Sequence, residues 1–507
     1  MSRPSDKRLS ADGAAALIRD GACVAITGAG GGLLEPDFIL EGIERRFLAT
    51  GHPRGLTIVH AQGIGDRDRR GLNRLAYEGL VRRVIGGHWT WSPRMQELAR
   101  SEKTEAYALP GGVLSLLMRE CGARRPGLFS QVGLGTFVDP RLQGGRMNAS
   151  ARDDLVEHVT IGGEPFLHYK PLTIDVAILR GSSADLHGNT SFEREPSNLD
   201  GYALALAAHA GGGIALVQVG QIAELQTRGP RDIVLPAPLV SGVVVCAGQP
   251  QSHRNQYDPA LSGEARSHRI LPIELPVGIR GVIARLAALE AFPGCVASFG
   301  FGIPDGVARI LAHEAFDFLP SIDHGVFGGT SLDGDMFGFV ENPDVIVNAT
   351  DQIDFYHGGG IDIAFLGFGE IDARGNVNAS MIGGVPVGPG GFMDIAHGAR
   401  KLVFCGTFDA VGASLTFDDG RLRIERHGRL QKLVESVAQI TFCAAEAQRV
   451  GKNVVYVTER AVFELADGGV WLKAIAAGVD LQRDVLDRMG FRPQLAERIE
   501  TFVPSTV

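Results

Sequence analysis

The chain of 507 residues is long enough for two to four domains, since one domain usually takes roughly 100–200 residues. Its net charge of -9 without a basic block argues against nucleic acid, and its 68 glycines, many of them inside apolar runs without a Gly-X-Y period, exclude collagen and low-complexity disorder. The N-terminal stretch lacks an apolar signal-peptide core, and no apolar run reaches the roughly 18 residues of a membrane span, so we expect a cytoplasmic protein.

The cysteines and histidines show no metal-site spacing. There is no CxxC pair and no H-E-x-x-H motif, so the pattern predicts no metal site and reduced, mostly buried cysteines. The six cysteines lie far apart in the chain, at Cys23, Cys121, Cys246, Cys295, Cys405 and Cys443.

The first predicted element is a strand that ends in a glycine-rich turn, VAITGAGGG at 24–32, before an amphipathic helix over 37–47. The turn matches the dinucleotide fingerprint only in part, because Leu33 takes the third glycine position and no acidic residue closes the unit about 20 residues on. A P-loop is absent. Such glycines either let backbone amides approach a ligand oxygen or form structural turns, and the residues alone leave both readings open.

An internal repeat organises the rest of the chain. Asp175 and the apolar run after it return at Asp362, and the Asp185–Asn189 turn returns at 372–376, both with an offset of 187 residues. We therefore predict two homologous α/β modules in tandem, at 1–270 and 275–507, each with an open, mainly parallel sheet. The proline-rich stretch 228–278 is the expected connection, the strand–turn–helix pattern recurs at 296–316, and a helix over 481–491 is expected to close the second module.

Two features of the second module stand out chemically. The glycine-rich runs 358–360 and 383–394 cost conformational entropy to order, which a ligand or close chain packing should offset. Asp323, in SIDHGVFGG, follows an apolar strand-like run and precedes glycine-bearing turns. A carboxylate there suits covalent or base chemistry, but an Asp that stabilises a turn fits the same pattern.

These residues resemble the fused, single-polypeptide family I CoA-transferases, the acyl-CoA:acetate/3-ketoacid or propionate CoA-transferases, over nearly the whole chain. The first half carries RVIGGHW (83–89), VGLGTFVDPR (132–141), ADLHGNTSFERE (184–195) and YDPALSGEAR (257–266). The second half carries NPDVIVNATDQIDFYHGGGIDIAFLG (342–367) and QITFCAAEAQRVGKNVVYVTERAVFEL (439–465). The tandem repeat agrees, because the family is a fusion of related α and β subunits.

The resemblance implies transfer of CoA from a short-chain acyl-CoA to a carboxylic acid, with CoA as a substrate and no tightly bound cofactor. The expected assembly is a homodimer or homotetramer. A carboxylate in the second module forms anhydride and thioester intermediates, and glycine loops contact CoA or stabilise oxyanions. The positions that match are Asp323 for the nucleophile and Gly300, Gly302, Gly388, Gly390 and Gly391 for the loops, with Gln62 and Gly135 as weaker candidates for the acyl side.

The chain departs from the family at the nucleophile itself. The family motif is similar to T-V-E-x-G, whereas this sequence reads Ser321-Ile-Asp323-His324-Gly, one methylene shorter. A shifted backbone would restore the reach and retain CoA transfer. A gap that admitted water, with Asp323 as general base and His324 assisting, would instead give acyl-CoA hydrolysis. A relative that binds CoA without catalysis is the third reading.

Overall fold

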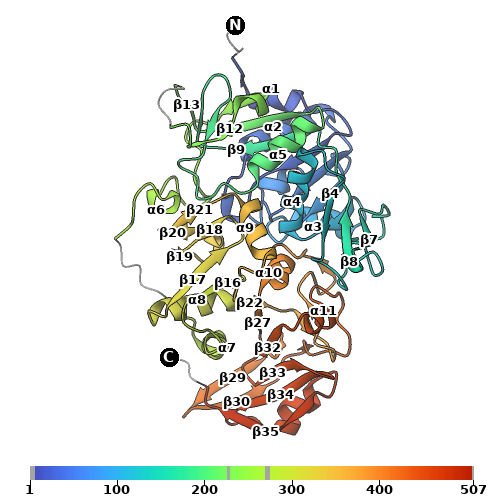
Figure 1. Ribbon diagram of the computed structural model, residues 1–507, viewed down its shortest axis with the longest axis vertical. Helices are drawn as coiled ribbons and strands as arrows, with labels where there is room; N and C mark the ends of the chain where they lie inside the picture. Colours follow the sequence, from blue (N-terminus) through green and yellow to red (C-terminus); the bar gives the residue numbers. More distant parts are fainter. Residues whose placement is uncertain (1–5, 225–228, 269–273, 505–507) are drawn as a thin grey trace.

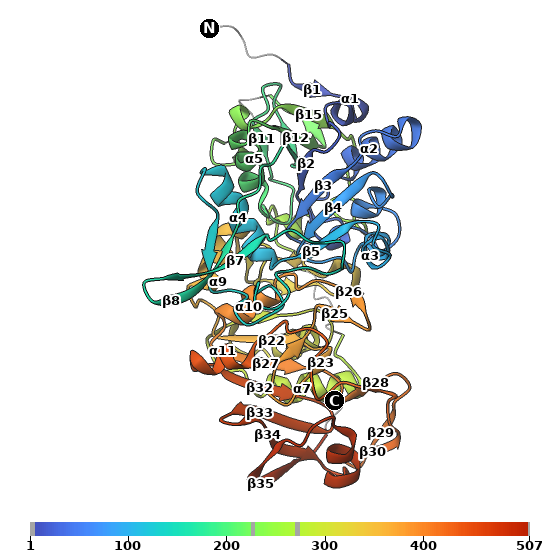
Figure 2. The ribbon, with the colours of Figure 1, turned by 90° about the vertical axis from the view of Figure 1, so that its right-hand side faces the viewer.

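The computed structural model describes residues 6–224, 229–268 and 274–504, which form an elongated molecule built on two large sheets (Figures 1 and 2). The first half of the chain forms the upper part in Figure 1, and the second half forms the lower part. None of the described helices is long and apolar enough to cross a membrane.

The first sheet has eight strands, and all neighbouring strands in it run parallel. In spatial order they are β1 (Arg8–Leu9), β15 (Gly242–Val245), β12 (Ile214–Val219), β9 (Val176–Arg180), β2 (Cys23–Ile26), β3 (Leu56–His60), β4 (Val81–Gly86) and β5 (Glu105–Ala108). The accompanying helices are α1 (Ala11–Ala16), α2 (Asp37–Thr50), α3 (Pro93–Arg100), α4 (Gly111–Gly122) and α5 (Gly201–Ala210). Strands β3 and β9 are buried along their whole length, as their continuous apolar runs predict for a sheet covered on both faces.

Two small sheets complete this half. One joins β6 (Leu128–Ser130), β7 (Val156–Ile161) and β8 (Glu164–Tyr169), and the other joins β10 (Ser183–Ala184), β11 (Thr190–Ser191), β13 (Gln221–Ile222) and β14 (Ile233–Leu235).

The second sheet has ten strands around a parallel centre of five. Its order is β21 (Val345–Ile346), β18 (Val326–Phe327), β17 (Phe318–Ile322), β16 (Cys295–Phe299), β22 (Ile363–Gly367), β27 (Lys401–Cys405), β32 (Asn453–Val457), β33 (Ala461–Ala466), β34 (Gly469–Ala476) and β35 (Gln494–Phe502). Its helices are α7 (Gly278–Ala288), α8 (Ile303–His313), α9 (Ala349–His357), α10 (Phe392–Gly398) and α11 (Ala444–Arg449), while α6 (Pro259–Ser262) lies in the connection. Antiparallel strands flank the parallel centre on both sides.

The predicted repeat is confirmed strand by strand. The order β3-β2-β9-β12-β15 in the first sheet matches β17-β16-β22-β27-β32 in the second. The repeated aspartates make the same bond, since Asp175 accepts from the Cys23 amide at 2.8 Å and Asp362 accepts from the Val296 amide at 3.0 Å. The fold is therefore α/β with two homologous, mainly parallel sheets.

Two expectations about element positions are only partly right. The stretch 228–278 is not all connection, because β14 and β15 lie within it and β15 pairs with β12 of the first sheet. The stretch 481–491 is helical over 481–488, as a π-helix (Leu481–Val485) and a 3-10 helix (Leu486–Arg488), but it does not close the second module, because strand β35 follows it. The expected boundary between modules, at 270–275, falls largely on residues 269–273, which lie outside the described residues.

The two halves dock through shared apolar cores. Phe339 and Met393 of the second half pack in the core of the first, and Leu116 on α4 packs in the core of the second. In Figure 1, α9 and α10 accordingly lie beside α4 in the middle of the molecule.

Candidate functional site

Asp323 lies where a central strand of the second sheet ends. Strand β17 stops at Ile322, and Asp323 begins the tight turn into β18. The parallel register pairs Ser321 with Ser298 of β16, so both strands end at the same edge of the sheet. Ligands of open α/β sheets bind at this carboxyl edge. The Asp323 side chain is 15% exposed, so it is largely enclosed yet reachable.

Groups from both halves of the chain surround this carboxylate. The Gln62 side chain, two residues beyond β3, donates a long hydrogen bond of 3.5 Å to Asp323 Oδ2. His324 Nε2 lies 3.9 Å from Asp323 Oδ1, and its Nδ1 lies 3.3 Å from the Gly338 carbonyl oxygen. The sequence prediction of Gln62 as a site residue therefore agrees with its position beside Asp323, at a separation of 261 residues in the chain.

The electrostatic setting favours a carboxyl group that holds its proton more tightly than usual. Burial raises the pKa of Asp323, and the negative charge of Asp394 raises it further, while His324 and the Gln62 hydrogen bond act in the opposite direction. The net direction is upward from the ordinary value of 3.8. A raised pKa also makes the ionised carboxylate more basic than a free one.

Gly391 closes one side of the Asp323 carboxylate. It immediately precedes α10, and a Cβ atom built on it would lie 1.8 Å from Asp323 Oδ2. Only a glycine permits this approach. Among the described residues, the Gly391 amide has no hydrogen-bond partner, so it remains able to donate to an oxygen at this position.

Gly388 and Gly390 were predicted as CoA or oxyanion contacts, but their amides already form hydrogen bonds within the protein. The Gly388 amide donates to the Ser380 carbonyl at 3.0 Å, and the Gly390 amide donates to the Gly87 carbonyl at 2.7 Å. The Gly390 carbonyl in turn accepts from the Gly111 amide at 2.7 Å. Both amides are already satisfied within the protein, so these glycines serve close chain packing that clamps the 387–391 loop against the first half.

Gly300 and Gly302 lie at the neighbouring strand end. The Gly300 amide donates to the Phe365 carbonyl at 2.8 Å, so it too is used within the sheet. Gly302 has a φ of 93°, which favours glycine, and begins α8 with open space where a Cβ would be. Gly300 follows the paired Ser298 by two residues, as Asp323 follows its partner Ser321.

The structure does not bring Gly135 to Asp323. The Gly135 amide donates to Asp139 at 3.0 Å, and a Cβ on Gly135 would meet the Cys443 sulfur. Gly135 lines a separate cavity of about 610 Å³ whose walls include Arg374 and Gln448. Its assignment to the acyl side finds no support in this geometry.

Sequence reasoning missed a buried polar network behind Asp323. Asp394, on α10, has no exposed side-chain surface; its Oδ2 accepts from the Gly112 amide of α4 at 2.9 Å, and its Oδ1 lies 2.9 Å from His357 Nε2. This carboxylate therefore ties α10 to both halves. The sequence showed Asp394 only as the end of a glycine-rich run and His357 only as one scattered histidine, so no local signal paired them.

Comparison with known proteins finds related sequences over nearly the whole chain. A family model described as coenzyme A transferase matches residues 8–246. The chain is 39% identical over 495 residues to the acetate CoA-transferase YdiF of Escherichia coli K12. The aligned region covers 97% of this chain and 93% of that protein. It is 40% identical over 502 residues to the caffeate CoA-transferase of Acetobacterium woodii, with coverages of 97% and 95%.

A solved structure agrees over the full length. The crystal structure of the acyl-CoA transferase YdiF apoenzyme from Escherichia coli O157:H7 superimposes with a TM-score of 0.94 at 37% sequence identity, covering 100% of this chain and 98% of that one. A structure of the same protein as a thioester complex with CoA gives a TM-score of 0.93.

Proposed function

The chain belongs to the coenzyme A transferase family, and from that premise we propose that it moves CoA from an acyl-CoA to a carboxylic acid with Asp323 as the nucleophile. We assign Asp323 as the nucleophile because Gln62 from the first half of the chain and Gly391 from the second enclose its carboxylate. A short-chain acyl group follows from the resemblance to acetate CoA-transferase.

The first half-reaction transfers CoA to the enzyme. A carboxylate oxygen of Asp323 attacks the thioester carbonyl carbon, and the C–S bond breaks to give an acyl-aspartyl anhydride and CoA thiolate. The thiolate then attacks the aspartyl carbonyl carbon, which releases the donor carboxylate and leaves an aspartyl-CoA thioester. Gly391 lies against the carboxylate, and its amide, which has no hydrogen-bond partner among the described residues, is the donor that we assign to the developing oxyanion.

The second half-reaction runs these steps in reverse with the acceptor. The acceptor carboxylate attacks the aspartyl thioester, CoA thiolate leaves, and the thiolate then attacks the acceptor carbonyl of the new anhydride. The products are the acceptor acyl-CoA and the free Asp323 carboxylate. No external oxidant, reductant or net proton is required.

The shorter nucleophile does not by itself argue for hydrolysis. Gln62 and Gly391 both lie against Asp323 Oδ2, which leaves less room for a water molecule beside that oxygen. The curated relatives are named for CoA transfer, which favours transfer over hydrolysis.

The test follows free thiol and new acyl-CoA together after mixing the protein with acetyl-CoA and propionate. We expect propionyl-CoA without net thiol release. Asp323→Asn should abolish it, since an amide oxygen is a poor nucleophile, while Asp317→Asn, an exposed aspartate just before β17, serves as the matched control. Thiol release without propionyl-CoA would support hydrolysis, and neither product would support binding alone.

The intermediate is checked separately. Borohydride should reduce an aspartyl-CoA thioester at Asp323 to the alcohol, and an unchanged intact mass after treatment with acetyl-CoA would contradict covalent catalysis. The homodimeric or homotetrameric assembly and the cytoplasmic location stay predictions, the first of which light scattering of the purified chain would test.

A further inference from the structure

His60 is a buried histidine that contacts Gln62, the residue that donates to the proposed nucleophile. It ends strand β3, and 1% of its surface is exposed. Its Nδ1 lies 2.7 Å from the Gln62 carbonyl oxygen, and its Nε2 accepts a hydrogen bond of 3.0 Å from the Trp89 indole. Trp89 has no exposed surface. Both rings therefore lie directly behind the residue that contacts Asp323.

These two contacts fix the protonation state of His60. Burial lowers the pKa of His60 to about 4, so the ring is neutral at neutral pH and carries one proton. A carbonyl oxygen only accepts hydrogen bonds, and an indole N–H only donates them. The proton of His60 is therefore on Nδ1, which donates to the Gln62 carbonyl oxygen, while Nε2 accepts from Trp89.

Two glycines allow the segment that carries Trp89 to lie against His60. Gly86 of strand β4 pairs with His60 in the parallel register, and a Cβ atom on Gly86 would lie 2.2 Å from His60 Nε2. A Cβ atom on Gly87 would lie 1.9 Å from the Ala61 carbonyl oxygen. Real Cβ atoms essentially never come this close to another group, so only glycine fits at both positions.

Trp89 also joins this group to the loop on the other side of Asp323. Its backbone amide donates to the Val387 carbonyl at 2.8 Å, across the boundary between the two halves of the chain. The same loop ends at Gly391, which lies against Asp323 Oδ2. Gln62 contacts that oxygen as well. Trp89 therefore forms hydrogen bonds with both segments that meet at Oδ2.

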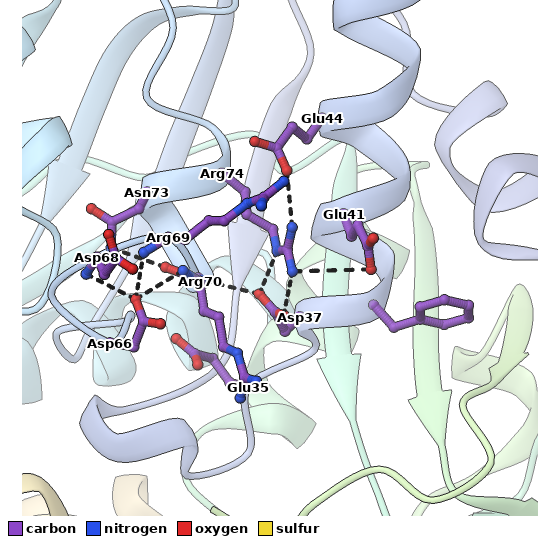
Figure 3. A network of polar contacts seen from close by, with 12 residues as sticks. Glu35, Asp37, Glu41, Glu44, Asp66, Asp68, Arg69, Arg70, Asn73 and Arg74 are labelled. Carbon is purple, nitrogen blue, oxygen red and sulfur yellow. Dashed lines mark hydrogen bonds and ion pairs between the residues drawn. The ribbon is translucent and has the colours of Figure 1, made fainter. Parts of the chain in front are cut away.

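The chain that follows Gln62 is anchored as well. Asp66 accepts hydrogen bonds from the amides of residues 68–70 at 2.7–2.9 Å (Figure 3). Further along, the Arg74 guanidinium forms hydrogen bonds of 2.8 and 2.9 Å with Asp37 of α2 (Figure 3). The backbone of Gln62 is thus held on both sides along the chain, which sets the position of its side-chain amide before a substrate binds.

We propose that Gln62 donates a hydrogen bond to the oxyanion that forms on Asp323 Oδ2. His60 and Trp89 are positioning residues in this proposal, because they hold Gln62 in place. The inference rests on the proposed function and assigns further residues to its aspartyl intermediate. Gln62 and Gly391 both lie against Oδ2, so the attack on the thioester falls to Oδ1.

The oxyanion arises when the CoA thiolate attacks the acyl-aspartyl anhydride. The bond between sulfur and Cγ forms, and the π electron pair of Cγ=Oδ2 moves onto Oδ2. The pair returns as the Cγ–Oδ1 bond breaks, and the donor carboxylate leaves with Oδ1, so no proton is gained or lost. The 3.5 Å between Gln62 Nε2 and Oδ2 is long for a hydrogen bond, and it shortens as charge collects on Oδ2. Gln62 therefore stabilises the transition state more than the ground state.

The test is a double-mutant cycle on kcat for propionyl-CoA formation from acetyl-CoA and propionate. The single variants are Gln62→Leu, His60→Leu and Trp89→Phe, and one double variant combines Gln62→Leu with His60→Leu. His60→Asn is the conservative variant, because its side-chain amide N–H takes the place of Nδ1–H. Trp471→Phe, which removes an exposed indole hydrogen bond of 2.9 Å to the Asp467 carbonyl, is the matched control for Trp89→Phe. The thermal unfolding midpoint of each variant is measured alongside.

Loss of one oxyanion donor costs about 100-fold in kcat, and we expect a fall of that size for Gln62→Leu. His60→Leu should lower kcat by about 10-fold and Trp89→Phe by about 3-fold, while His60→Asn should stay within about 3-fold of the wild type. Since His60 acts through Gln62, adding His60→Leu to Gln62→Leu should lower kcat by less than about 2-fold further. Trp471→Phe should leave kcat unchanged.

The pH profile separates positioning from a general loss of structure. The Gln62 hydrogen bond lowers the pKa of Asp323 against the effect of burial, so its loss raises that pKa. Because the carboxylate must be ionised to attack, the acidic limb of kcat/KM should move to higher pH in Gln62→Leu and in His60→Leu. Trp471→Phe should keep the acidic limb of the wild type.

Three results would overturn the inference. The first is a folded Trp89→Phe or His60→Leu protein with the kcat of the wild type; Trp89→Phe keeps a buried ring in place and reports on the hydrogen bond even if His60→Leu does not fold. The second is a double variant in which the two losses add, because His60 would then act independently of Gln62. The third is an acidic limb that does not move in Gln62→Leu. A wild-type protein that forms no propionyl-CoA would overturn the proposed function itself, so the two failures are distinguishable.

Discussion

Replacing Gly391 with alanine tests whether the contact between Gly391 and Asp323 positions the nucleophile. The backbone of Gly391 has a φ of -80° and a ψ of -3°, which an alanine adopts without strain. The only direct consequence of the added methyl group is therefore steric. It would lie 1.8 Å from Asp323 Oδ2 and 2.8 Å from its Cγ.

The size of the effect follows from that overlap. Since real Cβ atoms essentially never come closer than 3.0 Å to another group, the carboxylate or the loop must move by about 1.2 Å. The loop is clamped by the hydrogen bonds of Gly390 to Gly87 and Gly111, each 2.7 Å long, so the side chain of Asp323 is the part that moves. A misplacement of about 1 Å can cost roughly 100-fold in rate, and we expect kcat to fall by about that factor.

The assay is the initial rate of propionyl-CoA formation from acetyl-CoA and propionate. Gly220→Ala is the matched control, because a Cβ there would meet its nearest atom at 3.4 Å, an ordinary contact. The thermal unfolding midpoint of each variant separates a displaced nucleophile from loss of the fold. A folded Gly391→Ala protein with kcat within about 3-fold of the wild type would refute the reasoning.

The remaining predictions concern pH and stability. Asp323 must be ionised to attack, and its pKa is raised, so kcat/KM should rise with pH through that pKa. Asp394→Asn removes a negative charge that raises the pKa of Asp323, so the acidic limb of the pH profile should move to lower pH. An acidic limb that does not move in Asp394→Asn would contradict this role of Asp394. Arg460→Leu leaves the buried Asp409 without its 2.7 Å ion pair, so it should lower the free energy of unfolding in urea titrations by about 3–5 kcal/mol. Arg423→Leu removes an exposed ion pair with Asp418 and should change the free energy of unfolding by at most about 1 kcal/mol. Equal losses of unfolding free energy in Arg460→Leu and Arg423→Leu would contradict the conclusion that the buried ion pair contributes more than the exposed one.

The repeated fold was predictable because its signals are local. The buried runs at Asp175 and Asp362 show in the sequence that a parallel strand is covered on both faces, and the equal offset shows that the same unit occurs twice. The structure adds that each aspartate bonds an amide of the neighbouring strand. The apolar spacing of the stretch 481–491 correctly predicted a helical segment, but not that it is a short π-helix and 3-10 helix followed by strand β35.

The glycine loops show the limit of such signals. A glycine run indicates a close approach but not the group that is approached, so Gly388 and Gly390 were predicted to meet a ligand, whereas their amides bond Ser380 and Gly87. Gly391, one residue on, is the position that faces Asp323.

The sequence by itself determined the class of fold, its duplication, and a carboxylate at the end of a central strand, because hydrophobic periodicity and glycine placement act over a few residues. Only the tertiary structure decided that Gln62, Gly391 and the Asp394 network surround that carboxylate. These residues are separated by up to 282 positions from their partners in the chain, and nothing in their local patterns encodes the docking of two sheets through shared apolar cores. The geometry of that docking places them within reach of one another.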